Sequence, residues 1–230
     1  MLSFKKVLII LIPLFVIGLT YFFFSSKEKE TEKKTEKKPL PEMTVQEKKA
    51  RFISIILPVA KEVYSELVTR YQEVSSALKA GETFDDLKEE YGASSDEELL
   101  MALKPHPISI TLAQAAMESS WATSRFFREA NNIFGVWSFD ENDDRIAAGE
   151  KRGNKTIWLK KYSSVEAAIS DYYRTLARGK AFVAFRRLNL TTSDPYKLVK
   201  KLNKYSEKGA LYGEELTSII KFNKFYEHDL

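Results

Sequence analysis

The stretch AQAAMESSWATSRFFREANNIFGVWSF, residues 113–139, decides how this sequence is interpreted. Its alanine-rich beginning predicts a helix that holds Glu118. On a helix the side chains three and four positions away lie beside Glu118, and they are mostly small or apolar: Gln114, Ala115, Trp121 and Ala122. A carboxyl group in such surroundings is poorly hydrated, which disfavours its anion and raises its pKa.

A raised pKa is what a general acid needs, because the carboxyl must hold a proton near neutral pH until it protonates the leaving oxygen of a glycosidic bond. The small side chains beside Glu118 also leave room for a sugar ring. The alternative that the pattern leaves open is a surface glutamate at a helix end.

The N-terminal segment has a different character. Residues 7–24, VLIILIPLFVIGLTYFFF, carry no charge, and a bilayer core needs roughly 20 apolar residues. We therefore expect residues 1–24 to be a single transmembrane anchor. A cleaved signal peptide is the alternative, but the run ends in bulky aromatic residues rather than a small-residue cleavage site. Residues 25–44 are charged and of low complexity, which predicts a solvated tether.

From residue 45 to residue 230 the pattern predicts one mainly α-helical domain. Apolar residues recur at helical steps from Phe52 to Leu67, with a kink expected at Pro58. A second helix is expected to hold residues 112–121. Turn-forming residues between positions 137 and 161 surround a short β-favouring run, which predicts a small β-hairpin lobe.

Composition excludes several kinds of site. The 230 residues include no cysteine and two histidines, which argues against a disulfide framework, a zinc site and a histidine-based triad. There is no glycine-rich phosphate loop. The formal net charge is +4, and no dense basic block in the folded part indicates nucleic-acid binding.

Three motifs then occur in a recognisable order. AQAAMESSWATSRF followed by NNIFGVW resembles the glucosaminidase domain of glycoside hydrolase family 73, the Bax-like subgroup in particular, whose motif has the form AQAALESGWG…NNLFG. KYSSVEAAISDYYRTL is similar to its F-x-S-x-x-x-A-x-x-D-Y segment, and KYSEKGALYGEELTSII to its Y-A-T-D-P-x-Y-x-x-x-I block. The resemblance covers about residues 108–222.

The resemblance implies a lysozyme-like helical fold with a β-lobe, no cofactor or metal, and hydrolysis of the β-1,4 bond after N-acetylglucosamine in peptidoglycan. It implies Glu118 as the general acid and Tyr205 as an essential tyrosine beside the cleavage site. Tyr212 is expected to be a packing residue. The substrate groove is expected to use Asn132, Phe134 and Gly135, with Trp121 and Trp137 as stacking platforms.

Two departures from the family pattern stand out. The usual Gly-Trp-Gly after the motif glutamate is Ser120-Trp121-Ala122, which is expected to leave slightly less room. The usual Tyr-Ala-Thr-Asp is Tyr-Ser-Glu-Lys at residues 205–208, so only its tyrosine is carried over.

The second catalytic carboxylate has no motif of its own. A two-carboxylate mechanism needs a partner at about 5–5.5 Å for retention or 6.5–9.5 Å for inversion. The lobe offers Glu141, Asp143, Asp144 and Glu150, of which Asp144 and Glu150 are our candidates. Alternatively all four are solvated, and the substrate's acetamido group or a water held by Tyr205 does this work.

Two other functions stay open: a lytic transglycosylase on the same fold, which needs no second carboxylate, and a non-catalytic peptidoglycan-binding tether. A wall substrate places the domain on the periplasmic or extracellular side of a bacterial cytoplasmic membrane that residues 7–24 span once. The lysines after the anchor do not themselves favour this orientation. No pattern indicates the oligomeric state.

Overall fold

The computed structural model describes residues 41–152 and 155–229, without the side chains of residues 150–155. The expected anchor and nearly all of the expected tether lie outside the described residues. Within those described, no helix is both long enough and apolar enough to cross a membrane.

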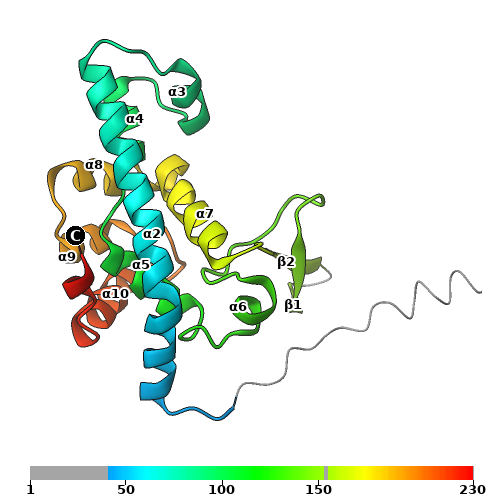
Figure 1. Cartoon of the computed structure of the whole chain (residues 1–230). Helices are drawn as coiled ribbons and strands as arrows, with labels where there is room; N and C mark the ends of the chain where they lie inside the picture. Colours follow the sequence, from blue (N-terminus) through cyan, green and yellow to red (C-terminus); the bar gives the residue numbers. More distant parts are fainter. Residues whose placement is uncertain (1–40, 153–154, 230) are drawn as a thin grey trace, which may run out of the picture. The chain divides into compact units, whose positions relative to one another are not determined.

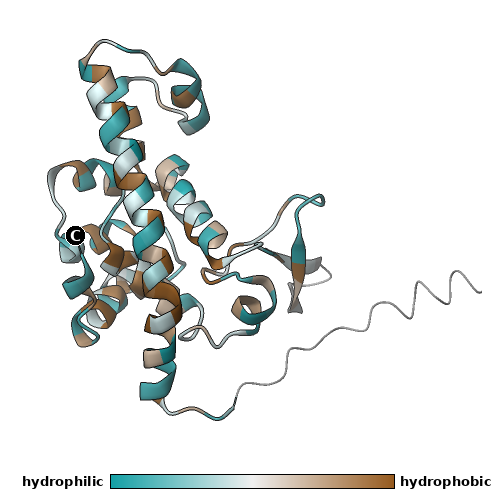
Figure 2. Cartoon of the chain, viewed as in Figure 1, coloured by the Kyte–Doolittle hydropathy of each residue, from teal (hydrophilic) through white to brown (hydrophobic). Residues whose placement is uncertain are grey.

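Helix α2 (Val45–Lys79) runs alongside α4 (Asp96–Leu103), α5 (Ile108–Glu118) and α7 (Val165–Arg178) (Figure 1). It begins with a capping box, in which the Thr44 hydroxyl accepts from the Glu47 amide at 3.3 Å and the Glu47 carboxylate accepts from the Thr44 amide at 2.7 Å. Hydrophilic and hydrophobic residues alternate along the helix (Figure 2), and Phe52 is among those buried. Pro58 lies inside the helix without ending it.

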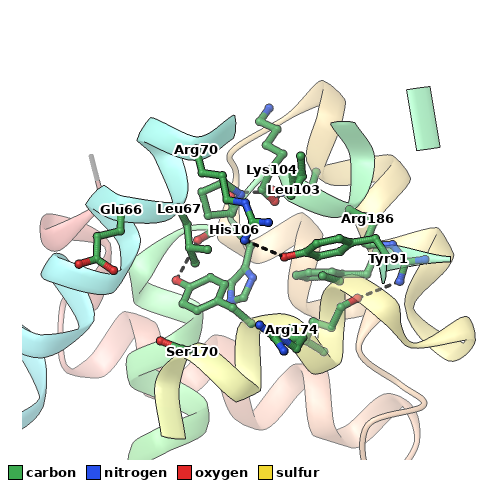
Figure 3. Close-up of a pocket in the computed structure, with 17 residues that line it drawn as sticks. Glu66, Leu67, Arg70, Tyr91, Leu103, Lys104, His106, Ser170, Arg174 and Arg186 are labelled. Carbon is green, nitrogen blue, oxygen red and sulfur yellow. Dashed lines mark hydrogen bonds between the residues drawn. The ribbon is translucent and has the colours of Figure 1, made fainter. Parts of the chain in front are cut away.

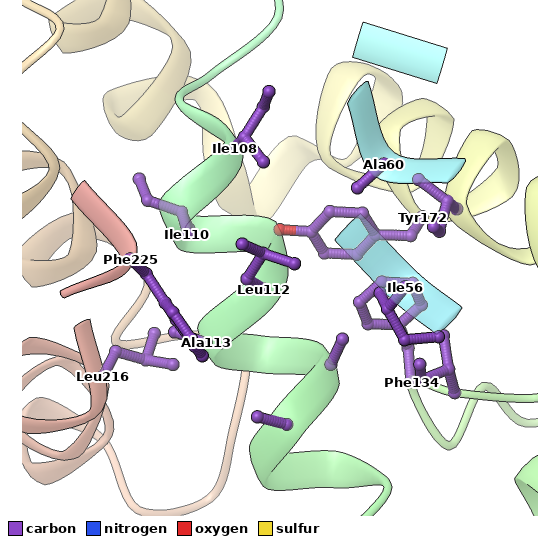
Figure 4. Close-up of a cluster of buried hydrophobic side chains, with 14 of the residues drawn as sticks. Ile56, Ala60, Ile108, Ile110, Leu112, Ala113, Phe134, Tyr172, Leu216 and Phe225 are labelled. Carbon is purple, nitrogen blue, oxygen red and sulfur yellow. The ribbon is translucent and has the colours of Figure 1, made fainter. Parts of the chain in front are cut away.

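Helix α5 (Ile108–Glu118) forms the centre of the core. Every residue from 108 to 116 is buried, as is typical of a helix that lies inside a core with other elements packed around it. Those neighbours include α2, α10 (Ala210–Phe222) and the 3₁₀ turn η3 (Phe225–His228). Figure 4 shows Ile56, Leu216 and Phe225 converging on α5 from these elements.

The other helices of the described region surround this centre. They are α3 (Asp85–Tyr91), α4 (Asp96–Leu103), α6 (Arg125–Ala130), α7 (Val165–Arg178), α8 (Val183–Thr191) and α9 (Pro195–Leu198), with 3₁₀ turns η1 (Lys180–Phe182) and η2 (Val199–Lys201).

The expected β-hairpin lobe is present. Strands β1 (Arg145–Arg152) and β2 (Lys155–Lys160) pair antiparallel, with Arg145 opposite Lys160 and an irregular register between Ala147 and Lys151. The predicted fold class, mainly α with a two-stranded β-hairpin, is therefore confirmed for the described residues.

The chain just after α5 differs from the expectation. The helix was expected to reach Trp121, but it ends at Glu118, and Ser120, Trp121 and Ala122 have φ angles of 51°, 62° and 58°. Non-glycine residues rarely adopt this left-handed conformation, which costs about 1–2 kcal/mol per residue. The family pattern has glycine at the first and third of these positions, where glycine avoids this strain. The main consequence of Ser120 and Ala122 in this chain is therefore backbone strain, and not the smaller space that the sequence led us to expect.

This strain predicts that Ser120→Gly stabilises the protein. Ser120 is exposed, so the change removes little packing, and relief of the left-handed strain should exceed the added entropy of the unfolded chain by about 0.5–1 kcal/mol. Chemical denaturation measures the change. Ser163→Gly, at an exposed serine without a positive φ, is the control and should not stabilise. A Ser120→Gly protein no more stable than the wild type would contradict this account of the turn.

His106 lies in the core with 3% of its surface exposed. Its ring stacks on Tyr173 at a centroid distance of 4.5 Å, and its Nε2 lies 3.2 Å from the Thr111 hydroxyl and 3.0 Å from the Tyr172 hydroxyl. Burial lowers the pKa of His106 from 6.5 to about 3, so the imidazole is neutral in the folded protein across the physiological range.

The lowered pKa predicts a loss of stability on acidification. Below pH 6.5 the unfolded chain binds a proton at His106 that the folded chain does not bind until about pH 3. Stability is therefore complete above pH 6.5 and lost as pH falls, by about 2 kcal/mol between pH 6.5 and pH 5. Chemical denaturation of the wild type and of His106→Gln at several pH values between 6.5 and 5 measures this loss. The variant has no histidine at this position and should lack the corresponding part of the pH dependence. Parallel pH profiles for the two would contradict the assignment.

Candidate active site

Glu118 is the last residue of α5, where the buried helix reaches the surface. The Tyr212 hydroxyl, from α10, donates a hydrogen bond to Glu118 Oε1 at 3.0 Å. Glu118 as a whole residue is exposed, as an acid that must reach a substrate has to be. The position at a helix end is the one that the alternative interpretation of the sequence gave, while the partial burial of the carboxyl is what the main interpretation expected.

The surroundings of Glu118 raise its pKa, and burial of the carboxyl is the main cause. The Tyr212 hydrogen bond and the Lys208 charge lower the pKa, while the Glu215 charge raises it. Glu118 also sits at the negative end of the helix dipole of α5, which disfavours a carboxylate. The effect of burial exceeds the opposing contacts, so the group keeps its proton to higher pH than an ordinary glutamate.

The sequence led us to expect Tyr212 to be a packing residue, but the structure gives it a second role. Its side chain is buried, and its hydroxyl is the group that contacts Glu118. Tyr205 stacks on Tyr212 with ring centroids 5.4 Å apart and planes at 17°. Burial and the neighbouring Glu118 charge raise the pKa of Tyr205, so its phenol is neutral near Glu118. Both motif tyrosines therefore lie on the same side of the candidate acid.

An open groove of about 590 Å³ lies next to this group. Its lining is largely apolar, from Met117, Leu211 and Ile219. Lys208 and Glu215 also line it and form an ion pair of 2.7 Å. Glu118 does not itself line the groove, but Met117, the residue before it, does, and the charges of Lys208 and Glu215 act on the pKa of Glu118. A polymer lying in it would have a proton donor at its edge.

The NNIFG residues mainly build the support for the lobe. Asn132 is 1% exposed, and its amide donates to the carbonyls of Val136 and Lys160 at 2.9 and 2.8 Å. Phe134 stacks on Tyr172 at 4.1 Å. Gly135 has a φ of 66°, which favours glycine there. These three residues hold the chain between α6 and the hairpin.

The two tryptophans lie in different surroundings. The Trp121 ring is partly buried and packs edge-on against Phe52 at 5.4 Å, with the Lys49 ammonium 4.9 Å from the ring centroid. Trp137 is 42% exposed and lies 6.1 Å from the ring of Phe139, which is 85% exposed. The exposed aromatic surface beside the lobe is thus formed by Trp137 and Phe139, while Trp121 contributes to the core.

The two candidates for the second carboxylate remain unassigned. Asp144 is exposed and lines a shallow pocket of about 360 Å³ with Tyr162 and Asp171. Glu150 belongs to β1, and its side chain lies outside the described residues. In the pocket that Asp144 lines, Asp171 accepts a hydrogen bond of 2.6 Å from the Tyr162 hydroxyl and forms an ion pair with Lys160 at 3.3 Å.

A separate pocket of about 230 Å³ lies near the beginning of α5, at His106 (Figure 3). Four cationic side chains line it, and each has a partner within the chain. Arg70 and Arg174 lie 3.9 and 3.7 Å from Glu90. Arg186 donates to two backbone carbonyls at the end of α7, and Lys104 donates to the Leu190 carbonyl. We interpret this pocket as part of the structural framework.

Sequence reasoning missed three polar residues near Glu118 or the lobe: Gln114, Tyr212 and Asp171. Gln114 was noted as a helix neighbour, and its complete burial within an apolar helix is the signal of a specific partner. Tyr212 and Asp171 belong to the motif blocks. The partner of Tyr212 is Glu118, which is distant in sequence, and the partner of Asp171 is Tyr162, which lies before the helix that holds Asp171. Among the described residues there is no group of three metal-binding side chains.

The glucosaminidase family model, described as mannosyl-glycoprotein endo-beta-N-acetylglucosaminidase, matches residues 97–225. Protein bax of Escherichia coli (strain K12) is 31% identical over 124 residues, which cover 51% of this chain and 43% of that protein. Exo-glucosaminidase LytG of Bacillus subtilis (strain 168) is 25% identical over 198 residues, or 77% of this chain and 65% of LytG.

Both curated relatives are therefore matched over less than two thirds of their length. A similar solved structure is the peptidoglycan hydrolase from Sphingomonas sp. A1, with a TM-score of 0.49, 14% identity, and coverage of 77% of this chain and 91% of that one. The family model covers more than half of the chain and includes all three motifs. The resemblance seen in the sequence is confirmed, and the chain belongs to the glucosaminidase family of glycoside hydrolases.

Proposed function

We propose that this chain is an endo-β-N-acetylglucosaminidase that hydrolyses the β-1,4 bond after N-acetylglucosamine in peptidoglycan, without a cofactor. The observation that carries the proposal is the position of Glu118. A carboxyl with a raised pKa ends a buried helix, directly follows Met117, which lines an open groove, and accepts a hydrogen bond from Tyr212. The substrate class is supported by the three family motifs in their expected order.

In this proposal Glu118 gives its proton to the glycosidic oxygen as the bond to the sugar breaks. The raised pKa favours the protonated form that this role requires. Tyr205, neutral and close to Glu118, orients either the attacking water or the substrate's acetamido group. Trp137 and Phe139 offer exposed rings on which sugar faces can stack. Asp144 and Glu150 stay candidates for a base or nucleophile.

The proposal also concerns the place of action. We propose that residues 1–24 anchor the protein in a bacterial cytoplasmic membrane and that residues 25–44 are a tether. The domain of residues 45–230 then acts on the periplasmic or extracellular side. The support for this arrangement is the uncharged run of residues 7–24 and a substrate that lies outside the membrane.

A lytic transglycosylase is the second candidate function, and the charged residues around Glu118 favour it. The charged side chains that act on the pKa of Glu118 are Lys208 and Glu215, and neither belongs to the β-lobe. Glu215 is itself paired with Lys208, which makes it a poor base. An enzyme that needs a single acid and no second carboxylate fits this surrounding as well. A non-catalytic tether is disfavoured because it has no need for a protonated carboxyl beside a groove.

Substitution of Glu118 tests the proposed acid. Glu118→Gln keeps the shape and can still accept the Tyr212 hydrogen bond, but it has no proton to deliver. General acid catalysis contributes about 10²–10⁴ in rate, so release of soluble fragments from purified sacculi should slow at least a hundredfold. The thermal midpoint should stay the same or rise slightly, because a poorly hydrated ionisable group is removed.

The matched control is Glu62→Gln, the same chemical change at an exposed position of α2, which should keep the wild-type rate. A folded Glu118→Gln protein with activity within a few-fold of the wild type would refute the assignment of the acid.

A further inference from the structure

One face of the buried helix α5 is polar. Thr111, Gln114 and Glu118 lie three and four residues apart and so project from the same side. Thr111 and Gln114 are completely buried. Buried polar groups are costly without partners, and the partners of such groups are usually specific. The surroundings of Gln114 therefore explain why an amide occupies this position in an otherwise apolar segment.

Both ends of the Gln114 amide are used. Its Nε2 donates to the Tyr212 hydroxyl at 2.8 Å, and its Oε1 accepts from the Tyr172 hydroxyl at 2.6 Å. Tyr172 comes from α7 and Tyr212 from α10, so Gln114 connects two helices that pack against α5. Figure 4 shows the Tyr172 hydroxyl directed at α5.

The hydrogen bonds that connect His106, Tyr172, Gln114, Tyr212 and Glu118 all run in one direction. A tyrosine hydroxyl has one hydrogen to donate. Tyr172 donates its hydrogen to Gln114, so in its contact of 3.0 Å with His106 the Nε2–H group is the donor. Tyr212 accepts from Gln114, and its own hydrogen is directed to Glu118. Every hydrogen bond from His106 to Glu118 thus points toward the candidate acid.

We propose that Gln114 is a positioning residue, which orients the Tyr212 hydroxyl toward Glu118 Oε1 so that the proton delivered to the substrate is carried on Oε2. Oε1 accepts a hydrogen from Tyr212, and in a protonated carboxyl the carbonyl oxygen is the better acceptor of the two, so the hydrogen bond favours Oε1 as the carbonyl oxygen. The other carboxyl oxygen is left for the proton that is transferred. This inference rests on the proposed role of Glu118 as the acid.

The amide is suited to this task because it has a donor at one end and an acceptor at the other. An apolar residue of similar size would contact both tyrosines but leave the Tyr212 hydroxyl free to rotate. The other groups that act on the Glu118 charge are Lys208 and Glu215, with Tyr205 close by. The hydrogen bond at Oε1 comes from Tyr212, so its direction depends on Tyr212 and Gln114.

The test compares Gln114→Met, Tyr212→Phe and the double variant in the full chain. Loss of the Tyr212 hydrogen bond removes an interaction that stabilises the Glu118 anion. The acid then keeps its proton to higher pH, and the alkaline limb of the kcat profile should move to higher pH in both single variants. The plateau kcat should fall about tenfold, the effect of about one hydrogen bond to a charged group, with KM nearly unchanged.

The double variant separates positioning from packing. If Gln114 acts through Tyr212, then Gln114→Met should cause no further shift of the alkaline limb in the Tyr212→Phe background. Tyr173→Phe is the matched control, because it removes another buried hydroxyl, bonded to Thr111, that is outside the chain to Glu118. It should lower the thermal midpoint and leave the pH profile unchanged.

Titration of the Glu118 carboxyl by ¹³C NMR gives a readout that does not require catalysis. The same upward movement in Gln114→Met and Tyr212→Phe is expected even if the substrate differs from the one proposed, so failure of the proposed function is distinguishable from failure of this inference. A folded Gln114→Met protein with wild-type titration and pH profile would overturn the inference. Full additivity of the two substitutions would also overturn it.

Discussion

Helix α5 has to be buried along its length and yet end at a residue that meets solvent. Its residues from 108 to 116 are covered on all sides, and Glu118 is the point at which the helix leaves the core. The chain turns there through three left-handed residues, Ser120 to Ala122. This turn ends the helix beside the groove. The strain at the turn is therefore located directly next to the proposed acid, where backbone strain often accompanies function.

The other elements hold what lies around this helix end. Helix α10 brings Tyr212 to Glu118, and Tyr205 stacks behind it. Asn132 fastens the segment after α6 to β2 through its amide hydrogen bond to the Lys160 carbonyl, and a second bond, to the Val136 carbonyl, holds the segment itself. These contacts set the position of the hairpin and of exposed Trp137. Burial and hydrogen bonding act in opposite directions on Glu118, and burial is the larger effect. The result is a carboxyl that is both held in place and able to keep a proton.

Much of this could be predicted from local patterns. Helical periodicity predicted the amphipathic face of α2, and turn residues around a β-favouring run predicted the hairpin. The small and apolar residues around Glu118 led to the expectation of a raised pKa, but of the four residues used only Gln114 and Ala115 lie on its helix, because Trp121 and Ala122 belong to the turn that follows. The contact with Tyr212 could not be predicted in this way, because 94 residues separate the two positions. The left-handed turn was missed because Ser-Trp-Ala carries no glycine to indicate it. Asp171 was overlooked because its partner Tyr162 precedes its helix.

The central claim is that the protonated carboxyl of Glu118 cleaves the bond after N-acetylglucosamine by hydrolysis. Mass spectrometry of the fragments that the full chain releases from purified sacculi tests this most directly, with Glu118→Gln as the matched blank. The account predicts new reducing ends that are N-acetylglucosamine and that are absent from the blank. Fragments that end in 1,6-anhydro-N-acetylmuramic acid, or no new ends with the wild-type protein, would contradict it.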